Sequence, residues 1–223
     1  MRYDDLVEKV DELENDAELS ECIYIGAMQR LENVRKDLRI LDDVKHVRRV
    51  IRPFLIQWGM MSRVAGRQDL DWKTLGVIIR ELESEFDKIR NSKLFTYDFN
   101  NQTNSQTIRT IYSRIREIPY LGGQTSATKI LHLFNPEIFV MWDIDILKDY
   151  NSRNSKVSSN PHGYVEFLKE VQKELRELLT EQSKKTGKKI EDIELELRKR
   201  YNNKTLARII DEYNWKNAHP ARY

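Results

Sequence analysis

The segment SQTIRTIYSRIREIPYLGGQTSATKILHLFNPEIFVMWD, residues 105–143, contains two amphipathic helical patterns joined by a glycine-containing turn. Apolar residues recur at helical spacing before the turn, in residues 108–115, and again after it, in residues 127–134. Pro119 ends the first pattern, because proline cannot continue the hydrogen bonding of a helix. The sequence therefore predicts two short helices connected by a hairpin.

The turn between these helices has the composition of an anion-binding site. Gly122 and Gly123 would let the backbone come close to another molecule. Free N–H groups at the start of the second helix favour an anion such as a DNA phosphate. Gln124, Thr125 and Lys129 lie in the first turns of that helix and could contact the same phosphate. These five residues are candidate DNA-binding residues.

Across residues 104–143 the chain resembles the helix-hairpin-helix DNA glycosylase superfamily, which has the endonuclease III-like fold. The family pattern is roughly Leu-Pro-Gly-hydrophobic-Gly-x-Lys-Thr-Ala, followed by an apolar helix and an apolar segment ending in an essential Asp. Here residues 118–126 read IPYLGGQTS, and the apolar segment ends at Asp143. The resemblance implies DNA as the partner and a base flipped into a cleft beside the hairpin. Some members carry a monovalent cation bound by hairpin carbonyls, and apart from such a cation no cofactor is expected for this chain.

Two departures from the family pattern narrow the implied chemistry. Tyr120 stands where the family has its first hairpin glycine, and Gln124 stands where bifunctional members carry the lysine that attacks the sugar. The resemblance therefore implies a monofunctional glycosylase, a hydrolase of DNA repair. In that reaction Asp143 would stabilise an oxocarbenium-like sugar and align a water for attack.

Asp143 also has an ordinary structural interpretation. It precedes the helical segment IDILKDY, where an aspartate serves as a helix N-cap, and the two roles are compatible. Asp145 is a second acid nearby, expected to face solvent, and Trp142 is expected in the core. Two other functions remain open: a DNA-binding module without catalysis, and a helical protein that self-associates.

The distribution of charge along the chain supports a nucleic-acid partner more strongly than the net charge does. The net charge is +2, but residues 21–68 hold ten Lys and Arg against five Asp and Glu. Further basic excesses lie in residues 184–208 and around the hairpin, where Arg109 is a candidate DNA contact. Arg63 is expected near the cleft. These side chains would form a phosphate-tracking face if they converge, and solvated helix faces if they do not.

The rest of the chain predicts an all-α fold in which long N- and C-terminal helices support the hairpin lobe. Residues 27–41 place apolar side chains on one seam of a long helix, through which two copies could associate. Residues 94–106 lose helical periodicity and predict a loop or a short two-stranded excursion. Three regions result, 1–93, 94–151 and 152–223, which could together form one domain.

Several classes of protein are disfavoured by the sequence. A single cysteine, Cys22, excludes an internal disulfide framework, and we expect it to be buried. His46 and His132 have no partner at metal-ligand spacing, so no metal site is expected. No apolar run reaches membrane-spanning length and the first residues are acidic, so the sequence predicts a cytoplasmic protein without a membrane partner.

Overall fold

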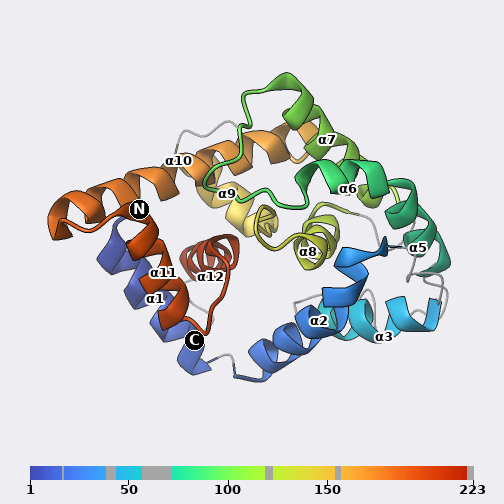
Figure 1. Cartoon of the computed structure of the whole chain (residues 1–223), viewed down its shortest axis with the longest axis horizontal. Coiled ribbons are helices and arrows are strands. Elements are labelled where there is room, and N and C mark those ends of the chain that lie inside the picture. The colour runs from blue at the N-terminus through green and yellow to red at the C-terminus, as the bar shows by residue number, and fades with distance from the viewer. Residues whose placement is uncertain (17, 39–43, 57–71, 119–122, 154–156, 220–223) are drawn as a thin grey trace.

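The computed structural model describes residues 1–16, 18–38, 44–56, 72–118, 123–153 and 157–219. All regular secondary structure in these residues is helical, so the predicted all-α class is confirmed (Figure 1). The helices are α1 (Tyr3–Asp16), α2 (Glu18–Lys36), α3 (Val44–Leu55), α5 (Trp72–Glu81), α6 (Glu83–Ile89), α7 (Gln102–Arg116), α8 (Gln124–Phe134), α9 (Ile144–Ser152), α10 (Pro161–Thr186), α11 (Ile190–Arg200) and α12 (Leu206–Ala218).

Helix α8 lies at the centre of the molecule (Figure 1). It packs against α2, α3 and α7, while α7 packs on α10 and α9 packs on α12. Helix α12 returns to α1, so the two ends of the chain lie together. One cluster of buried apolar side chains runs from Leu6 to Tyr213. The three regions distinguished in the sequence therefore share a single core.

The two helical patterns around the hairpin form α7 and α8 as predicted. Their apolar stripes are buried, namely Ile108, Ile111, Tyr112 and Ile115 in α7 and Ala127, Ile130, Leu131 and Phe134 in α8. Helix α7 begins at Gln102 because the Asn101 side chain accepts a hydrogen bond from the Asn104 amide at 3.1 Å. The hairpin turn itself, residues 119–122, lies outside the described residues.

The excursion expected at residues 94–106 contains no strand. Gln172 of α10 donates hydrogen bonds to the carbonyls of Leu94 and Tyr97, the latter at 2.7 Å. These bonds satisfy the backbone of a loop against α10, so the segment needs no partner strand. The polar loop ends where the Asn101 cap starts α7.

The expected self-association seam is wrong, because its residues face the core of the same chain. Helix α2 ends at Lys36, and the seam side chains in the described residues, Ala27, Leu31, Val34 and Leu38, are buried. Helix α2 packs against α3 and α8, which cover this stripe. Its apolar area is therefore not available to a second copy.

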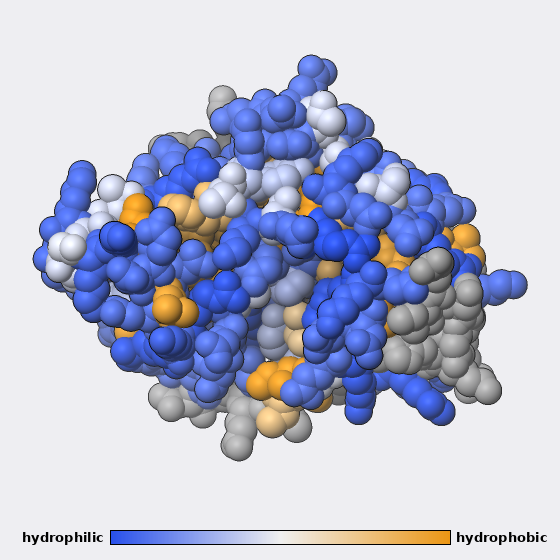
Figure 2. Space-filling model, viewed as in Figure 1, coloured by the Kyte–Doolittle hydropathy of each residue, from blue (hydrophilic) through white to orange (hydrophobic). Residues whose placement is uncertain are grey.

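The surface of the molecule is strongly polar. The face seen in Figure 2 is mostly hydrophilic, with apolar residues in small patches. No helix in the described part of the chain is long and apolar enough to cross a lipid bilayer. Cys22 is exposed on α2, contrary to the expectation that it is buried. Its side chain stays at the surface because the neighbouring Tyr24 and Ala27 occupy the buried stripe.

Candidate functional site

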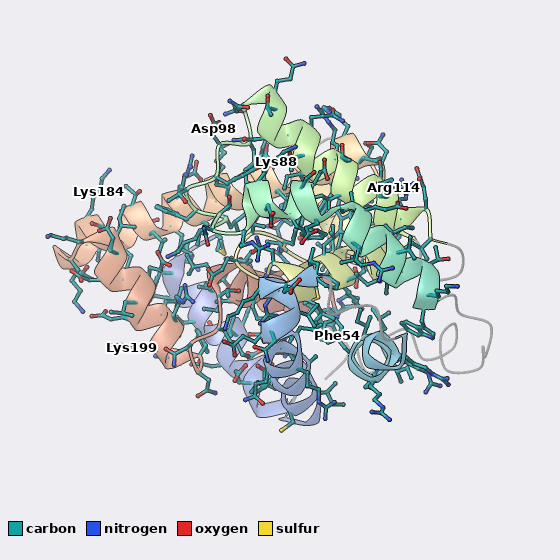
Figure 3. The ribbon with its side chains drawn as sticks, turned by 45° about the vertical axis from the view of Figure 1, so that its right-hand side comes forward. Phe54, Lys88, Asp98, Arg114, Lys184 and Lys199 are labelled. Carbon is teal, nitrogen blue, oxygen red and sulfur yellow. The ribbon has the colours of Figure 1, made fainter. Side chains whose placement is uncertain are left out.

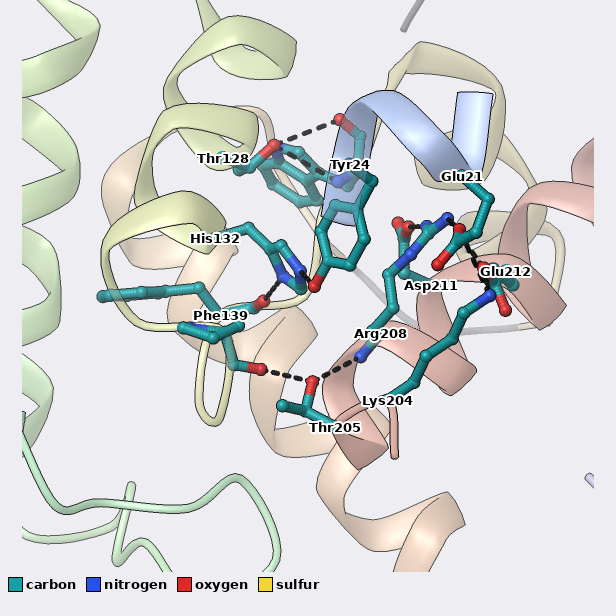
Figure 4. A network of polar contacts seen from close by, with 12 residues as sticks. Glu21, Tyr24, Thr128, His132, Phe139, Lys204, Thr205, Arg208, Asp211 and Glu212 are labelled. Atoms are coloured by element: carbon teal, nitrogen blue, oxygen red, sulfur yellow. Dashed lines mark hydrogen bonds and ion pairs between the residues drawn. The ribbon is translucent and has the colours of Figure 1, made fainter. Parts of the chain in front are cut away.

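The Thr128 hydroxyl fixes the segment before Asp143 to the first turns of α8. It accepts a hydrogen bond from the Trp142 amide at 3.2 Å. It also lies 3.1 Å from the Thr125 carbonyl and 3.3 Å from the Trp142 carbonyl (Figure 4). Trp142 itself is buried, as predicted. Asp143 is therefore held at a fixed place beside the N-terminal half of α8.

The two carboxylate oxygens of Asp143 have different surroundings. Its Oδ1 accepts hydrogen bonds from the amides of Asp145 and Ile146, each at 2.9 Å, so the predicted N-cap role is confirmed. Its Oδ2 lies 3.6 Å from Nε2 of His219. The side chain is 23% exposed. One oxygen thus orders the start of α9, and the other is directed away from the helix toward other side chains.

His219, which follows α12, is the main site residue that the sequence did not reveal. Its side chain is 5% exposed, and its ring stacks on Trp215 with the centroids 4.7 Å apart. Nδ1 lies 2.9 Å from the Trp215 carbonyl, and Nε2 lies 3.4 Å from Oδ2 of Asp145. The other Asp145 oxygen accepts a hydrogen bond from Lys148 at 2.9 Å, which lowers the pKa of Asp145.

Lys129 belongs to the same cluster of charged groups. Burial lowers its pKa to about 8, and the carboxylates of Asp211 and Asp143 oppose that shift. Burial also raises the pKa of Asp211 to about 7, although Arg208 contacts it at 2.6 Å. The Lys129 side chain therefore lies within electrostatic range of Asp143 and of α12, in addition to its position on α8.

Helix α8 starts without a side-chain cap. Gly123 is its N-cap residue, with φ of +120°, a conformation that residues with a side chain rarely adopt. Gly123 is exposed, and Gln124 and Thr125 are half-buried. Within the described residues, the buried Nε2 of Gln124 has no hydrogen-bond partner. Gly122 was predicted to lie beside Gly123, and it falls outside the described residues.

Arg109 is not part of this arrangement. Its Nε donates a hydrogen bond to the Gln106 side chain at 3.2 Å on the same helix. No hydrogen bond or ion pair in the described chain connects Arg109 with Asp143. Arg63 was predicted near the cleft and lies outside the described residues. The structure therefore brings together Asp143, Lys129 and the start of α8, and it places Arg109 elsewhere on α7.

The basic segments of the sequence differ in how far ion pairs neutralise their charge. In residues 184–208 the charge is largely neutralised by ion pairs inside the chain, namely Lys185–Asp4, Lys188–Glu196, Arg198–Glu137, Arg200–Asp11, Lys204–Glu212 and Arg208–Asp211. Helix α3 contains no acidic residue, and its Arg48 and Arg49 are exposed. No ion pair joins these two arginines to any described residue. Within the described residues, the α3 surface is therefore a basic face without compensating carboxylates.

The chain was compared with family models, with curated proteins and with solved structures, and none of the three comparisons finds a match. The likeness of residues 104–143 to the glycosylase superfamily accordingly stays a prediction from the sequence. What the protein does has to be inferred from its own geometry.

Proposed function

We propose that this chain binds DNA in the manner of a helix-hairpin-helix glycosylase and removes a base by hydrolysis with Asp143. The observation that carries the proposal is the Thr128 hydroxyl, which holds Asp143 next to the first turns of α8. An anion-binding helix start and a carboxylate with one uncommitted oxygen are thereby fixed side by side. DNA binding requires the helix start, and base removal requires both the helix start and the carboxylate.

The start of α8 is suited to a phosphate. Gly123 offers no side chain to cap the helix, so within the described residues no side chain caps the amides of Gln124 and Thr125. Such amides, together with the positive end of the helix dipole, favour a bound anion. Gly123 also leaves the approach open, because a Cβ built on it meets no atom within 4 Å in the described residues.

The basic face of α3 supplies long-range attraction to the same partner. Arg48 and Arg49 are exposed and have no carboxylate partner among the described residues, so their charge is available to phosphates. DNA binding by such side chains is driven by the release of counterions and weakens with salt. Helix α3 packs on α8, so this charge lies on a helix next to the one that would bind the phosphate (Figure 1).

Asp143 has the surroundings required of a group that activates water. Its Oδ1 is held by two backbone amides, and its Oδ2, which faces Nε2 of His219 at 3.6 Å, is the oxygen that would accept a proton. In the proposed reaction, water attacks C1′ of the flipped nucleotide and the bond from C1′ to the base breaks. The water proton passes to Asp143, the departing base takes a proton from solvent, and Asp143 then releases its proton to solvent. Gln124 cannot form an imine with the sugar, so the product is an intact abasic strand.

Binding is tested by fluorescence anisotropy of a labelled duplex over a series of salt concentrations. We expect affinity to fall steeply with salt, and Arg48→Gln with Arg49→Gln to lower the slope by about two ion equivalents. The control is Lys184→Gln with Lys199→Gln, two exposed lysines at the opposite side of the molecule (Figure 3). The control should leave the slope unchanged. Absence of binding at low salt would refute the proposal.

Catalysis is tested by screening duplexes with damaged or mismatched bases for base release. Asp143→Asn should abolish release and keep DNA affinity and stability, because asparagine also caps helices well. Release that is undiminished in Asp143→Asn contradicts the catalytic role. DNA binding without release from any duplex shows a non-catalytic DNA-binding module instead.

A further inference from the structure

Asp143, Asp145 and His219 bring three potential metal ligands together where the start of α9 meets the end of α12. Oδ2 of Asp143, Oδ2 of Asp145 and a ring nitrogen of His219 lie within 4.8 Å of one another. Asp143 and Asp145 stand at the start of α9, and His219 follows the end of α12, which packs on α9. In both carboxylates the other oxygen is already engaged, by backbone amides in Asp143 and by Lys148 in Asp145.

The ring of His219 directs its second nitrogen toward these oxygens. Nδ1 donates to the Trp215 carbonyl, 2.9 Å away, which can only accept. Nε2 lies 3.4 Å from Oδ2 of Asp145 and 3.6 Å from Oδ2 of Asp143, separations that exceed those of a well-formed hydrogen bond. The His219 side chain is 95% buried, so the packing of the protein and the Trp215 contact keep Nε2 at the two carboxylates.

The distances match the edges of a tetrahedral zinc site. Histidine nitrogens and carboxylate oxygens lie about 2.0–2.2 Å from zinc, so two ligands in a tetrahedron are about 3.4 Å apart. The measured separations from Nε2, 3.4 and 3.6 Å, fall at that value. An octahedral magnesium ion would bring its neighbouring ligands to about 2.9 Å, and it prefers oxygen to nitrogen.

We propose that Asp143, Asp145 and His219 bind one Zn²⁺ ion. The two carboxylates balance its charge, and the Trp215 carbonyl orients the imidazole, as the outer partners of zinc-bound histidines commonly do. Three protein ligands leave the fourth tetrahedral position for water, which is the arrangement of catalytic zinc sites. The site does not depend on the proposed DNA binding, but zinc on Oδ2 of Asp143 and proton transfer to that same oxygen exclude each other. His219 is far from Asp143 in the sequence, so no ligand spacing along the chain indicates the site.

A second cluster of acidic residues shows how this chain neutralises carboxylates with a cation of its own. Glu14, Glu21 and Glu212 also lie within ligand distance of one another. Their cation is already present, since the buried ammonium of Lys204 contacts all three carboxylates. In the cluster of Asp143, Asp145 and His219, no lysine or arginine of the described residues forms an ion pair with both carboxylates, since Lys148 contacts Asp145 alone and Lys129 acts on Asp143 at longer range.

The test is a calorimetric titration of the metal-free full chain with Zn²⁺ alone. Every protein carries Cys22→Ser, because the exposed thiol could bind zinc by itself. We expect one zinc ion per chain in the parent protein. In His219→Gln and in Asp145→Asn, affinity should fall at least about a hundredfold, since loss of an outer partner alone costs about 10- to 100-fold. Asp149→Asn, an acid on the same helix outside the cluster, is the control and should bind normally.

A second readout separates ligation from folding. Cobalt bound in place of zinc should show the visible absorption of a tetrahedral site in the parent protein and in Asp149→Asn only. Asp145 is 36% exposed, so Asp145→Asn should fold even where His219→Gln does not. No zinc binding by the parent, or unchanged affinity in Asp145→Asn, overturns the site and indicates an imidazolium paired with two carboxylates. The titration contains no DNA and leaves Asp143 intact, so its failure is distinct from failure of the proposed function.

Discussion

His132 connects three elements through its two ring nitrogens. Its Nδ1 donates to the Phe139 carbonyl at 2.6 Å, and its Nε2 accepts from the Tyr24 hydroxyl at 2.9 Å (Figure 4). The side chain is completely buried, and burial lowers its pKa to about 3. The neutral ring therefore joins α2, α8 and the segment before Asp143.

This histidine should make the fold sensitive to acid. Between pH 6.5 and 3 the unfolded chain binds a proton at residue 132 and the folded chain does not, so stability falls as the pH falls through this window. From pH 6.5 to 5.0, urea unfolding should show a loss larger in the wild type than in His132→Gln by about 1–2 kcal/mol. Tyr24→Phe keeps the histidine and should keep the wild-type pH dependence. Parallel curves for wild type and His132→Gln would contradict the assignment.

For single residues, the sequence predicted contacts correctly only where the partners are close to each other in the chain. Asp143 could be predicted as an N-cap because it bonds to amides two and three residues away. His219 could not be placed near Asp143, since their proximity depends on how α12 packs on α9. Cys22 was misjudged for the same reason, because a small apolar residue does not reveal which side of its helix faces the core.

Helix α10 begins in a tightly packed turn. Asn160 caps it, with its side chain accepting from the Gly163 amide at 2.8 Å, and Pro161 occupies the first turn. A Cβ at Gly163 would lie 1.8 Å from the backbone carbonyl oxygen of Ser158. Only glycine fits at this position, because the obstacle is backbone and cannot rotate away.

Gly163→Ala should destabilise the protein by at least about 1–3 kcal/mol, the usual cost of forced overpacking. The matched control is Gly26→Ala in α2, where an added Cβ meets no atom within 4 Å in the described chain. There alanine should raise stability by up to about 1 kcal/mol through helix propensity. Thermal unfolding of both variants decides the matter, and equal midpoints for the two would show that the Ser158 contact yields.

Helical periodicity predicted α7 and α8 well, because each packs a single continuous stripe on the core. The segment at 94–106 was harder, since its backbone is satisfied by Gln172 of α10. A side chain so distant in the sequence leaves no local signal. The predicted loop at 94–106 overlaps α7, which begins at Gln102, because the polar residues of its first turn show no apolar periodicity.

A buried ionic network connects the two ends of the chain. Lys204 and Arg208 contact Glu212 of α12 and Glu21 of α2, and Lys204 also reaches Glu14 of α1 (Figure 4). The Lys204 side chain is 3% exposed and that of Glu212 is 2% exposed. Since these charges are hidden from water, each depends on its partners for stabilisation.

Lys204→Met should therefore cost about 3–5 kcal/mol in free energy of unfolding, because it leaves Arg208 as the remaining cation for the carboxylates of Glu21, Asp211 and Glu212 among the described residues. Arg200→Met removes an ion pair with Asp11 that joins the same two ends of the chain, but its side chain is 51% exposed. That change should cost less than about 1 kcal/mol. Urea unfolding measures both, and comparable losses would mean that the network at Lys204 is no more important than a surface pair.

The Thr128 hydroxyl affects which position of a bound DNA strand would reach Asp143. It sets a constant spacing between the uncapped amides of α8 and the carboxylate of Asp143. Under the proposed function, the distance between the phosphate bound by the helix and the carboxylate determines which nucleotide of the strand reaches Asp143. The protein would then count along a strand by position before it distinguishes one base from another.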